Sequence, residues 1–110
     1  MKLSIIIVNY KMWQLTRALV ESLLKDESLP KGTEIIVVDN NSGDDSVYLL
    51  RSDFPEITVI DNEENLGLAA GVNVGIAHAT GTYYLVLNPD MIALPESVKM
   101  LVDFMDKNPA

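Results

Sequence analysis

The chain has 110 residues, a formal net charge of −8 and no cysteine. The length suits one domain, and the lack of cysteine excludes a disulfide framework, a catalytic thiol and a zinc-thiolate site. A surface with this excess of negative charge repels phosphate backbones, so a nucleic-acid-binding protein is not expected.

Apolar runs of strand length alternate with stretches of helical spacing along the whole chain. The runs are nearly continuous, which is typical of strands buried on both faces in a parallel sheet. The alternation therefore predicts a single α/β domain of three layers, α/β/α, around a mainly parallel four-stranded sheet. Strands are predicted at residues 3–8, 34–38, 57–60 and 82–87, and helices at 13–25, around 47–50, at 66–80 and from 95–96 onward.

The last two predicted helices have distinct apolar patterns. Helix 66–80 is rich in small side chains, and each glycine inside a helix costs about 0.5–1 kcal/mol relative to alanine, so something is expected to come close to its backbone. In the last helix, four apolar residues are expected to face the core. The positions are Leu68, Val72, Ile76 and Ala79 on one face of the first, and Val98, Leu101, Val102 and Met105 in the second.

Distinctive polar residues follow each predicted strand. Because the carboxyl ends of parallel strands meet at one edge of a sheet, these residues predict a ligand site there. The alternative is that loops are polar anyway and that asparagine favours turns, which explains one such loop better than four on the same edge. The residues are Asn9 and Tyr10, then Asp39, Asn40 and Asn41, then Asn62 and Asn65, and finally Asn88, Pro89 and Asp90.

Asp90 follows a strand that Asn88 and Pro89 bring to an end, because proline cannot donate to the sheet. A carboxylate in that turn suits a divalent metal or a sugar hydroxyl, and the alternative is that it caps a turn or the next helix. No Gly-x-Gly-x-x-Gly follows the first strand and there is no P-loop motif. The single histidine, His78, is expected to be a surface or packing residue, so a Ser-His-Asp triad is poorly supported.

Four blocks of the sequence resemble the family 2 glycosyltransferases, and the Asn-Pro-Asp form is most similar to their rhamnosyltransferase-like members. The blocks are SIIIVNY at 4–10, EIIVVDNNS at 34–42, NLG at 65–67 with GVNVGI at 71–76, and LNPD at 87–90. The resemblance implies the GT-A fold, with sheet order 3-2-1-4. It also implies a nucleotide-diphospho-sugar donor, a divalent cation (Mn²⁺ or Mg²⁺) and inverting transfer to the hydroxyl of a saccharide or lipid-linked acceptor in polysaccharide biosynthesis.

The resemblance also assigns roles to individual residues. Val8, Asn9 and Tyr10 would line the nucleotide pocket, and Asp39 would accept hydrogen bonds from the nucleobase or from groups near it. The diphosphate or sugar would be bordered by Asn65, Gly67, Gly71 and Asn73. The triplet from Asn88 to Asp90 takes the place of the family's Asp-x-Asp motif, with Asp90 holding the metal, and Asn88 replaces that motif's first acid.

In this family the catalytic base and most of the acceptor site come from a later segment. Residues 1–110 are therefore expected to be one nucleotide-diphospho-sugar-binding domain, truncated before the acceptor part, with the base beyond Ala110 and no catalytic residue of its own. Such a segment is expected to bind nucleotide weakly or not at all, to have no transferase activity, and to expose apolar surface that favours a homo-oligomer.

Two other functions stay open from the sequence. A nucleotidyltransferase would have the same fold class but usually has a glycine-rich basic loop after the first strand, where this chain has Asn9-Tyr10-Lys11-Met12. A non-catalytic module would use the acidic loops for a protein partner. No apolar run is long enough to cross a bilayer. A cytoplasmic protein is expected, with the inner face of a membrane as a second location for a longer enzyme; sugar, base and acceptor are left open.

Overall fold

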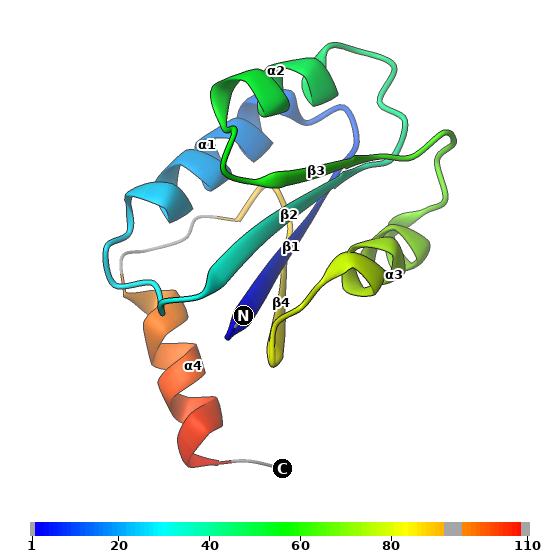
Figure 1. Cartoon of the computed structure of the whole chain (residues 1–110). Helices are drawn as coiled ribbons and strands as arrows, with labels where there is room; N and C mark the ends of the chain where they lie inside the picture. Colours follow the sequence, from blue (N-terminus) through cyan, green and yellow to red (C-terminus); the bar gives the residue numbers. More distant parts are fainter. Residues whose placement is uncertain (1, 92–95, 109–110) are drawn as a thin grey trace.

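The computed structural model describes residues 2–91 and 96–108. Four parallel strands form one sheet in the order β3-β2-β1-β4, with helices on both faces (Figure 1). The predicted three-layer fold and the strand order 3-2-1-4 are both confirmed. The elements are β1 (Leu3–Asn9), α1 (Trp13–Lys25), β2 (Thr33–Asp39), α2 (Ser46–Asp53), β3 (Thr58–Asp61), α3 (Leu68–His78), β4 (Tyr83–Leu87) and α4 (Ser97–Lys107). The predicted helix start at Pro95 lies outside the described residues.

Strand β1 is the centre of the molecule. All seven of its residues are buried, as expected for an aliphatic strand covered on both faces. Ile5 pairs with Ile35 of β2 on one side and with Leu85 of β4 on the other. The chain leaves β1 toward β2 and β3 and later returns to β4, so the strand order reverses between β1 and β4, where open α/β sheets bind ligands.

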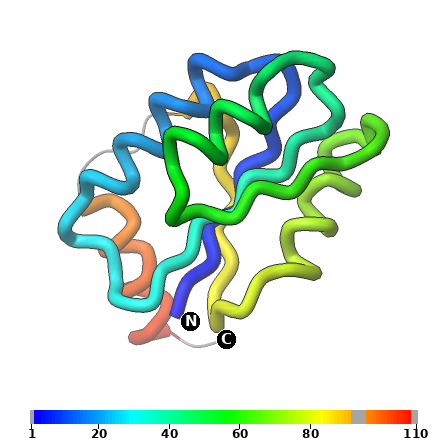
Figure 2. Tube along the Cα trace, turned by 45° about the horizontal axis from the view of Figure 1, so that its top comes forward, coloured from blue at the N-terminus to red at the C-terminus, as the bar shows by residue number. Residues whose placement is uncertain are grey.

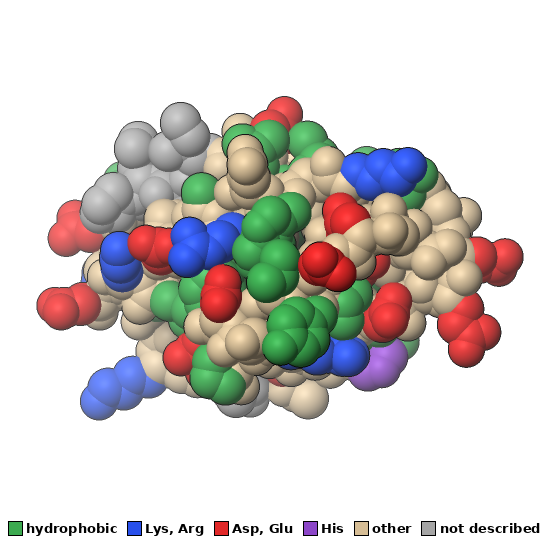
Figure 3. Space-filling model, turned by 90° about the horizontal axis from the view of Figure 1, so that it is seen from above, with side chains coloured by type: hydrophobic (Ala, Val, Ile, Leu, Met, Phe, Trp, Pro, Cys, Tyr) green, Lys and Arg blue, Asp and Glu red, His purple; other side chains and the backbone are tan. Residues whose placement is uncertain are grey.

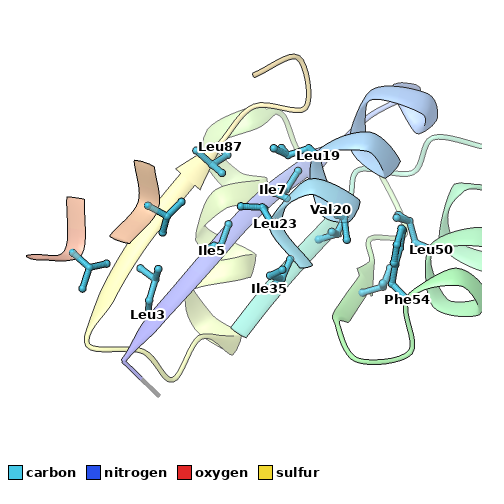
Figure 4. Packing of buried hydrophobic residues seen from close by; sticks show 14 residues of the cluster. Leu3, Ile5, Ile7, Leu19, Val20, Leu23, Ile35, Leu50, Phe54 and Leu87 are labelled. Carbon is cyan, nitrogen blue, oxygen red and sulfur yellow. The ribbon is translucent and has the colours of Figure 1, made fainter. Parts of the chain in front are cut away.

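The main hydrophobic core lies between the sheet and helices α1, α2 and α4. In Figure 4, Ile5 and Ile7 of β1 point toward α1. They belong to one cluster of buried side chains together with Leu23, which is completely buried. Each such aliphatic side chain contributes about 1.5–3 kcal/mol when it leaves water. This packing fixes α1 and the connection that precedes it over the carboxyl end of β1.

Among the described helices, α3 alone covers the opposite face (Figure 2), and it packs there through glycines. Gly71 and Gly75 are its buried residues, and a Cβ on Gly75 would lie 2.6 Å from Cγ2 of Ile6. The expectation that something approaches the backbone of this helix is therefore confirmed: it is the sheet. Leu68, from the aliphatic face that predicted the helix, is 59% exposed. The helix starts at Leu68 because the preceding Gly67 has a φ of +83°.

Helix α4 buries a narrower face than the sequence predicted. Val98 and Val102 are buried as expected, one turn apart. The prediction that Leu101 and Met105 face the core is wrong, because these side chains are 53% and 41% exposed. The reason is that α4 packs on the core cluster along the single row of Val98 and Val102.

The edge strand β4 is covered on one face and partly open on the other. Tyr84 and Val86 pair with Ser4 and Ile6, so they share the face on which α3 packs. Both are about half exposed, because α3 lies over β1 and β2 instead. Within the described part of the chain, no helix has the length and apolar character that crossing a membrane requires.

Candidate functional site at the carboxyl edge of the sheet

A solvent-open cavity of about 420 Å³ lies at the carboxyl edge of the sheet. Its volume falls in the range of small-molecule sites. Its walls come from the ends of β1, β2 and β4 and from the turn before α3, so segments far apart in sequence contribute to it. The lining residues are Val8, Tyr10, Met12, Asn40, Asn65, Gly67, Leu68, Asn88, Pro89 and Asp90.

The structure brings six of the ten predicted site residues together in this cavity. Tyr10 after β1 and Asp90 after β4 both line it, and they follow the two neighbouring strands between which the strand order reverses. Four predicted residues do not line it and have other surroundings. The six are Val8, Tyr10, Asn65, Gly67, Asn88 and Asp90, and the four are Asn9, Asp39, Gly71 and Asn73.

Asp90 belongs to a tight turn after β4. The backbone N–H of Met91 donates to the carbonyl of Asn88 at 3.0 Å, which closes the turn and leaves Asp90 exposed within it. In residues 2–91 and 96–108, the Asp90 carboxylate has neither a hydrogen bond nor an ion pair. Among these residues no group caps Asp90 or is capped by it, so Asp90 is an exposed acid of the cavity lining. The alternative raised from the sequence, that Asp90 caps a turn or the next helix, involves residues 92–95 and lies outside the described residues.

Tyr10 gives the cavity an aromatic wall. Its ring is 39% exposed, and the ammonium of Lys11 lies 5.2 Å from the ring centroid. A half-exposed phenol ring presents a flat apolar face on which a planar base can stack, with a polar group at its rim. Lys11 itself has a φ of +55°. The sharp turn there carries the chain from β1 to α1.

Asn9 and Asp39 form a buried polar network on the face of the sheet that packs against α1. They are neighbours in the register of β1 and β2, and both are almost fully buried. Asn9 Nδ2 donates to Asp39 Oδ1 at 2.7 Å, and Asn9 Oδ1 accepts from the Thr16 hydroxyl at 2.6 Å. Ser42 donates to both Asp39 oxygens, from its hydroxyl at 2.7 Å and from its backbone N–H at 3.0 Å.

This network holds in place a backbone segment next to the cavity. The Ser42 hydroxyl also accepts the backbone N–H of Lys11 at 2.9 Å, so the network fixes the segment that follows Tyr10. A buried carboxylate is costly unless it is hydrogen-bonded, and Asp39 accepts three such bonds. The side chains of Asn9 and Asp39 thus hold the ends of β1 and β2 in place instead of lining the cavity.

The two predicted residues on α3 differ from each other. Gly71 is buried, and a Cβ there would lie 3.0 Å from Nδ2 of Asn40. Asn73 is exposed on α3 and is not part of the cavity wall. The sequence placed Asn40 among the polar residues at this edge but assigned it no role in the site, whereas Gly71 was assigned one. The signal was present, because side chains alternate along a strand and Asn40 therefore shares the face of Val38, which lies near Gly75.

The charges around the cavity favour a ligand that brings a cation with it. Viewed from above, the surface shows more acidic than basic side chains, with several Lys and Arg side chains among the acids (Figure 3). Asp90 is the single carboxylate of the lining. The described residues contain no group of three or more histidine, cysteine or acidic side chains that could hold a metal ion by themselves. One carboxylate still fits Mg²⁺ or Mn²⁺, which are commonly held by one or two carboxylates together with substrate phosphates and water.

Comparison with known proteins identifies the family. The model of the family described as glycosyl transferase family 2 matches residues 4–110. The chain belongs to glycosyltransferase family 2. An uncharacterized glycosyltransferase of Haemophilus influenzae is 36% identical over 107 residues, which cover 97% of this chain and 35% of that protein. The uncharacterized glycosyltransferase YwdF of Bacillus subtilis is 32% identical, covering 92% of this chain and 37% of that protein. This family 2 chain thus spans about a third of the length of these curated relatives.

Solved structures share its fold. S. aureus TarS 1–349 superposes with a TM-score of 0.85 at 28% identity, over 97% of this chain and 33% of that one. TarS 1–349 has been solved in complex with UDP-GlcNAc and with UDP. The mannosyltransferase PcManGT from Pyrobaculum calidifontis, in complex with GDP-Man and Mn²⁺, has the same fold with a TM-score of 0.77, at 23% identity over 92% of this chain and 30% of that one. These matches confirm the GT-A fold that the sequence motifs imply.

Proposed function

We propose that this family 2 chain is the donor-binding part of an inverting glycosyltransferase that takes its sugar from a nucleotide diphosphate. The observation that carries the proposal is that Tyr10 and Asp90, which follow the two strands between which the strand order reverses, line one cavity. The cavity thus offers an aromatic surface for a base and an acid for a metal. Membership of the family supports a sugar as the transferred group.

The nucleotide end of the donor lies against the end of β1 in this proposal. The Tyr10 ring stacks on the base, while Val8 supplies apolar contact within the same wall. The assignment of Asp39 to the base rests on the resemblance alone, because its carboxylate is buried in the network with Asn9 and Ser42 and does not line the cavity. UDP is the nucleotide to test first, because the related TarS has been solved with UDP and UDP-GlcNAc.

The diphosphate end of the donor is assigned to Asp90 and to the turn before α3. Asp90 would hold Mn²⁺ or Mg²⁺, and such a cation neutralises the diphosphate as its bond to the sugar breaks. Asn88 is neutral where the family's motif has an acid, so Asp90 is the only charge that this triplet offers the cation. Asn65 and Gly67 line the same cavity and are assigned to the sugar or the phosphates. The assignments of Gly71 and Asn73 rest on the resemblance alone.

The remainder of the reaction is proposed for a part that the longer curated relatives have outside the region that matches this chain. Inversion requires a base that removes the proton of the acceptor hydroxyl as its oxygen attacks the anomeric carbon. The acceptor is a saccharide or a lipid-linked saccharide, and the relatives, of which this chain spans about a third, have the length to bind it. The 110-residue chain alone is therefore expected to bind donor nucleotide weakly and not to transfer sugar.

Location and assembly are proposals too. The protein is placed in the cytoplasm, with the longer enzyme at the inner face of the membrane where lipid-linked acceptors are found. Exposed apolar side chains on β4 and α4, among them Tyr84, Leu101 and Phe104, favour a homo-oligomer of this chain. Light scattering over a range of concentrations tests that assembly, and a monomer throughout would contradict it.

The test of the proposed function is a titration of the ¹⁵N-labelled chain with UDP, which detects even millimolar affinity by NMR. With Mg²⁺ present, UDP is expected to shift the amide signals of Tyr10, Gly67 and Asp90. With Mn²⁺, the signals near Asp90 are expected to broaden, and to do so more strongly when UDP is present. Asp90→Asn should abolish the broadening. Asp45→Asn, an exposed acid outside this cavity, is the matched control and should leave it unchanged.

Two results of this titration would contradict the proposal. If UDP shifts no signal with or without the cation, the donor-binding function is overturned and a non-catalytic module is favoured. If UDP binds but the broadening centres on the acidic hollow that contains Asp44, Asp45 and Asp61, Asp90 is not the metal ligand.

A further inference from the structure

Asn40 joins three separate segments at the carboxyl edge. It is the first residue after β2 and only 2% exposed, yet it contributes to the cavity lining. Its backbone N–H donates to the carbonyl of Asn9 at 2.9 Å. Its side-chain Nδ2 donates to the carbonyl of Gly67 at 3.0 Å, and its Oδ1 accepts from Nδ2 of Asn62 at 2.9 Å. Asn40 therefore connects three segments: its backbone bonds the end of β1, and its side-chain amide joins the loop after β3 to the turn before α3.

The Gly67 carbonyl is the point at which α3 begins. It accepts the N–H of Gly71 at 3.0 Å, which is a bond of the first helical turn, in addition to the amide of Asn40. On the other side, the Gly67 N–H donates to Asn65 Oδ1 at 2.9 Å, so the turn is held from both ends. Gly67 adopts a φ of +83°, which side chains rarely permit. The position of this carbonyl sets where the cavity wall of Asn65, Gly67 and Leu68 stands.

The small residue at 71 belongs to the same arrangement. A Cβ at Gly71 would lie 3.0 Å from Asn40 Nδ2 and 3.1 Å from Cγ1 of Val8. Helix α3 can therefore approach the Asn40 amide this closely only without a side chain there. The absence of a Cβ at Gly71 and the amide of Asn40 fit each other, which accounts for a costly glycine in the first turn of α3.

We propose that Asn40 is a positioning residue that sets the wall of Asn65, Gly67 and Leu68 at the distance from Tyr10 and Asp90 that the donor needs. This inference rests on the proposed function and adds to it a residue that does not carry the chemistry. The role requires a neutral amide, because the side chain must donate to the Gly67 carbonyl while accepting from Asn62. A carboxylate of the same shape would place negative charge against the carbonyl oxygen, and close to the bound diphosphate as well.

The test compares Asn40→Asp, which keeps the shape, with Glu34→Gln, which weakens a cluster at the opposite edge of the sheet. Two quantities are measured on the 110-residue chain at pH 7: the Kd for UDP with Mg²⁺ by NMR titration, and the hydrogen-exchange protection factor of the Gly71 amide. For N40D, Kd is expected to rise and Gly71 protection to fall, each on the order of tenfold. E34Q is expected to lower stability while leaving the Kd for UDP within twofold of the original.

A pH profile separates positioning from general loss of structure. A protonated carboxyl can donate to the Gly67 carbonyl again, so Gly71 protection relative to global stability should recover in N40D as the pH is lowered from 7 to 5. The original chain should show no such recovery. If N40D does not fold, Gly71→Ala provides the second route, since its Cβ displaces the Asn40 amide; the expected rise in Kd is several-fold.

The outcomes distinguish this inference from the proposed function. A Kd for UDP in N40D or G71A equal to that of the original chain overturns the positioning role while leaving donor binding intact. An effect on Kd no larger than that of E34Q also overturns it. If the original chain binds no UDP, the proposed function fails; unchanged Gly71 protection in N40D would then overturn the link from Asn40 to α3 as well.

Discussion

The two edges of the sheet both gather polar residues, but they use them differently. At the amino edge, Glu34 Oε2 accepts three hydrogen bonds: from the Ser4 hydroxyl at 2.5 Å, and from the Thr80 N–H and hydroxyl at 2.7 and 2.8 Å. The Ser4 hydroxyl in turn accepts the Gly81 N–H at 2.8 Å. At the carboxyl edge, Asp90 and Asn88 face a cavity. The chain itself satisfies the carboxylate at the amino edge, whereas within the described residues the side chains of Asp90 and Asn88 have no such partners.

The amino-edge cluster ties the connection from α3 to β4 onto the start of β1 and β2. Burial raises the pKa of Glu34, but the hydrogen bonds from Ser4 and Thr80 together outweigh that effect and leave the pKa below its usual value. The carboxylate form is therefore the one that the fold stabilises. Changes at this edge should affect stability, whereas changes to the cavity wall should affect ligands.

The largest effect on stability is expected from Gly81→Ala. A Cβ there would lie 2.6 Å from both the backbone nitrogen and the hydroxyl of Ser4, so the backbone must shift. We expect the free energy of unfolding in urea to fall by about 3 kcal/mol. Gly43→Ala is the control, since it has a positive φ but nothing within 4 Å, and should cost about 1 kcal/mol. Equal losses in the two variants would show that the amino edge is not tightly packed.

Asn9→Ala should have the next largest effect, because it affects stability and site together. It removes the partner of Thr16 and one donor to the buried Asp39. Leaving buried polar groups unsatisfied costs about 1–3 kcal/mol, so the urea midpoint should fall by a corresponding amount. The UDP-induced shift at Tyr10 should weaken at the same time. If stability falls but the Tyr10 signal responds as before, the buried network does not support the cavity.

Low pH should reduce the contribution of Glu34 at the amino edge to the free energy of unfolding. Because the pKa of Glu34 is lowered in the folded state, its contribution to stability is present above the unfolded value of 4.5 and is lost as the pH falls through the folded value. Urea unfolding at pH 7 and pH 3.5 should therefore show a smaller pH dependence in Glu34→Gln than in the original chain. An identical pH dependence in both would mean that the three hydrogen bonds do not favour the charged form.

Asp90→Asn should leave stability almost untouched. Its carboxylate is exposed and makes no hydrogen bond in the described ranges, so the free energy of unfolding should change by less than about 0.5 kcal/mol. Mn²⁺-dependent broadening should disappear nonetheless. A loss of stability comparable to that of Glu34→Gln would remove the distinction between the two edges.

The fold could be predicted from the sequence because the aliphatic runs, their alternation with stretches of helical spacing and the family resemblance all indicated the same architecture. The aliphatic runs predicted buried parallel strands, and Tyr10 and Asp90, which follow β1 and β4, line one cavity. Sequence reasoning treated each polar cluster as a unit and so grouped Asn9 and Asp39 with the cavity. Period-two alternation would have placed these two on the opposite face from Val8 and Asn40, which is where the structure has them.

Helix faces were harder to predict than strand faces. In α3, the contact face consists of Gly71 and Gly75, because a close approach to the sheet needs the absence of side chains, whereas apolar patterning points to Leu68 and its neighbours. In α4, Val98 and Val102 already fill the contact with the core, so Leu101 and Met105 remain exposed. Periodicity identifies apolar positions on a helix but not how much of that apolar face its neighbours will cover.

Donor binding at the carboxyl edge of the sheet is tested most directly by a crystal structure of the chain with UDP and Mn²⁺. We expect a single UDP between the end of β1 and the end of β4, with its base on the Tyr10 ring and its diphosphate joined to Asp90 through the metal. UDP bound instead beside α2, in the hollow that contains Asp44, Tyr48 and Asp61, would contradict it.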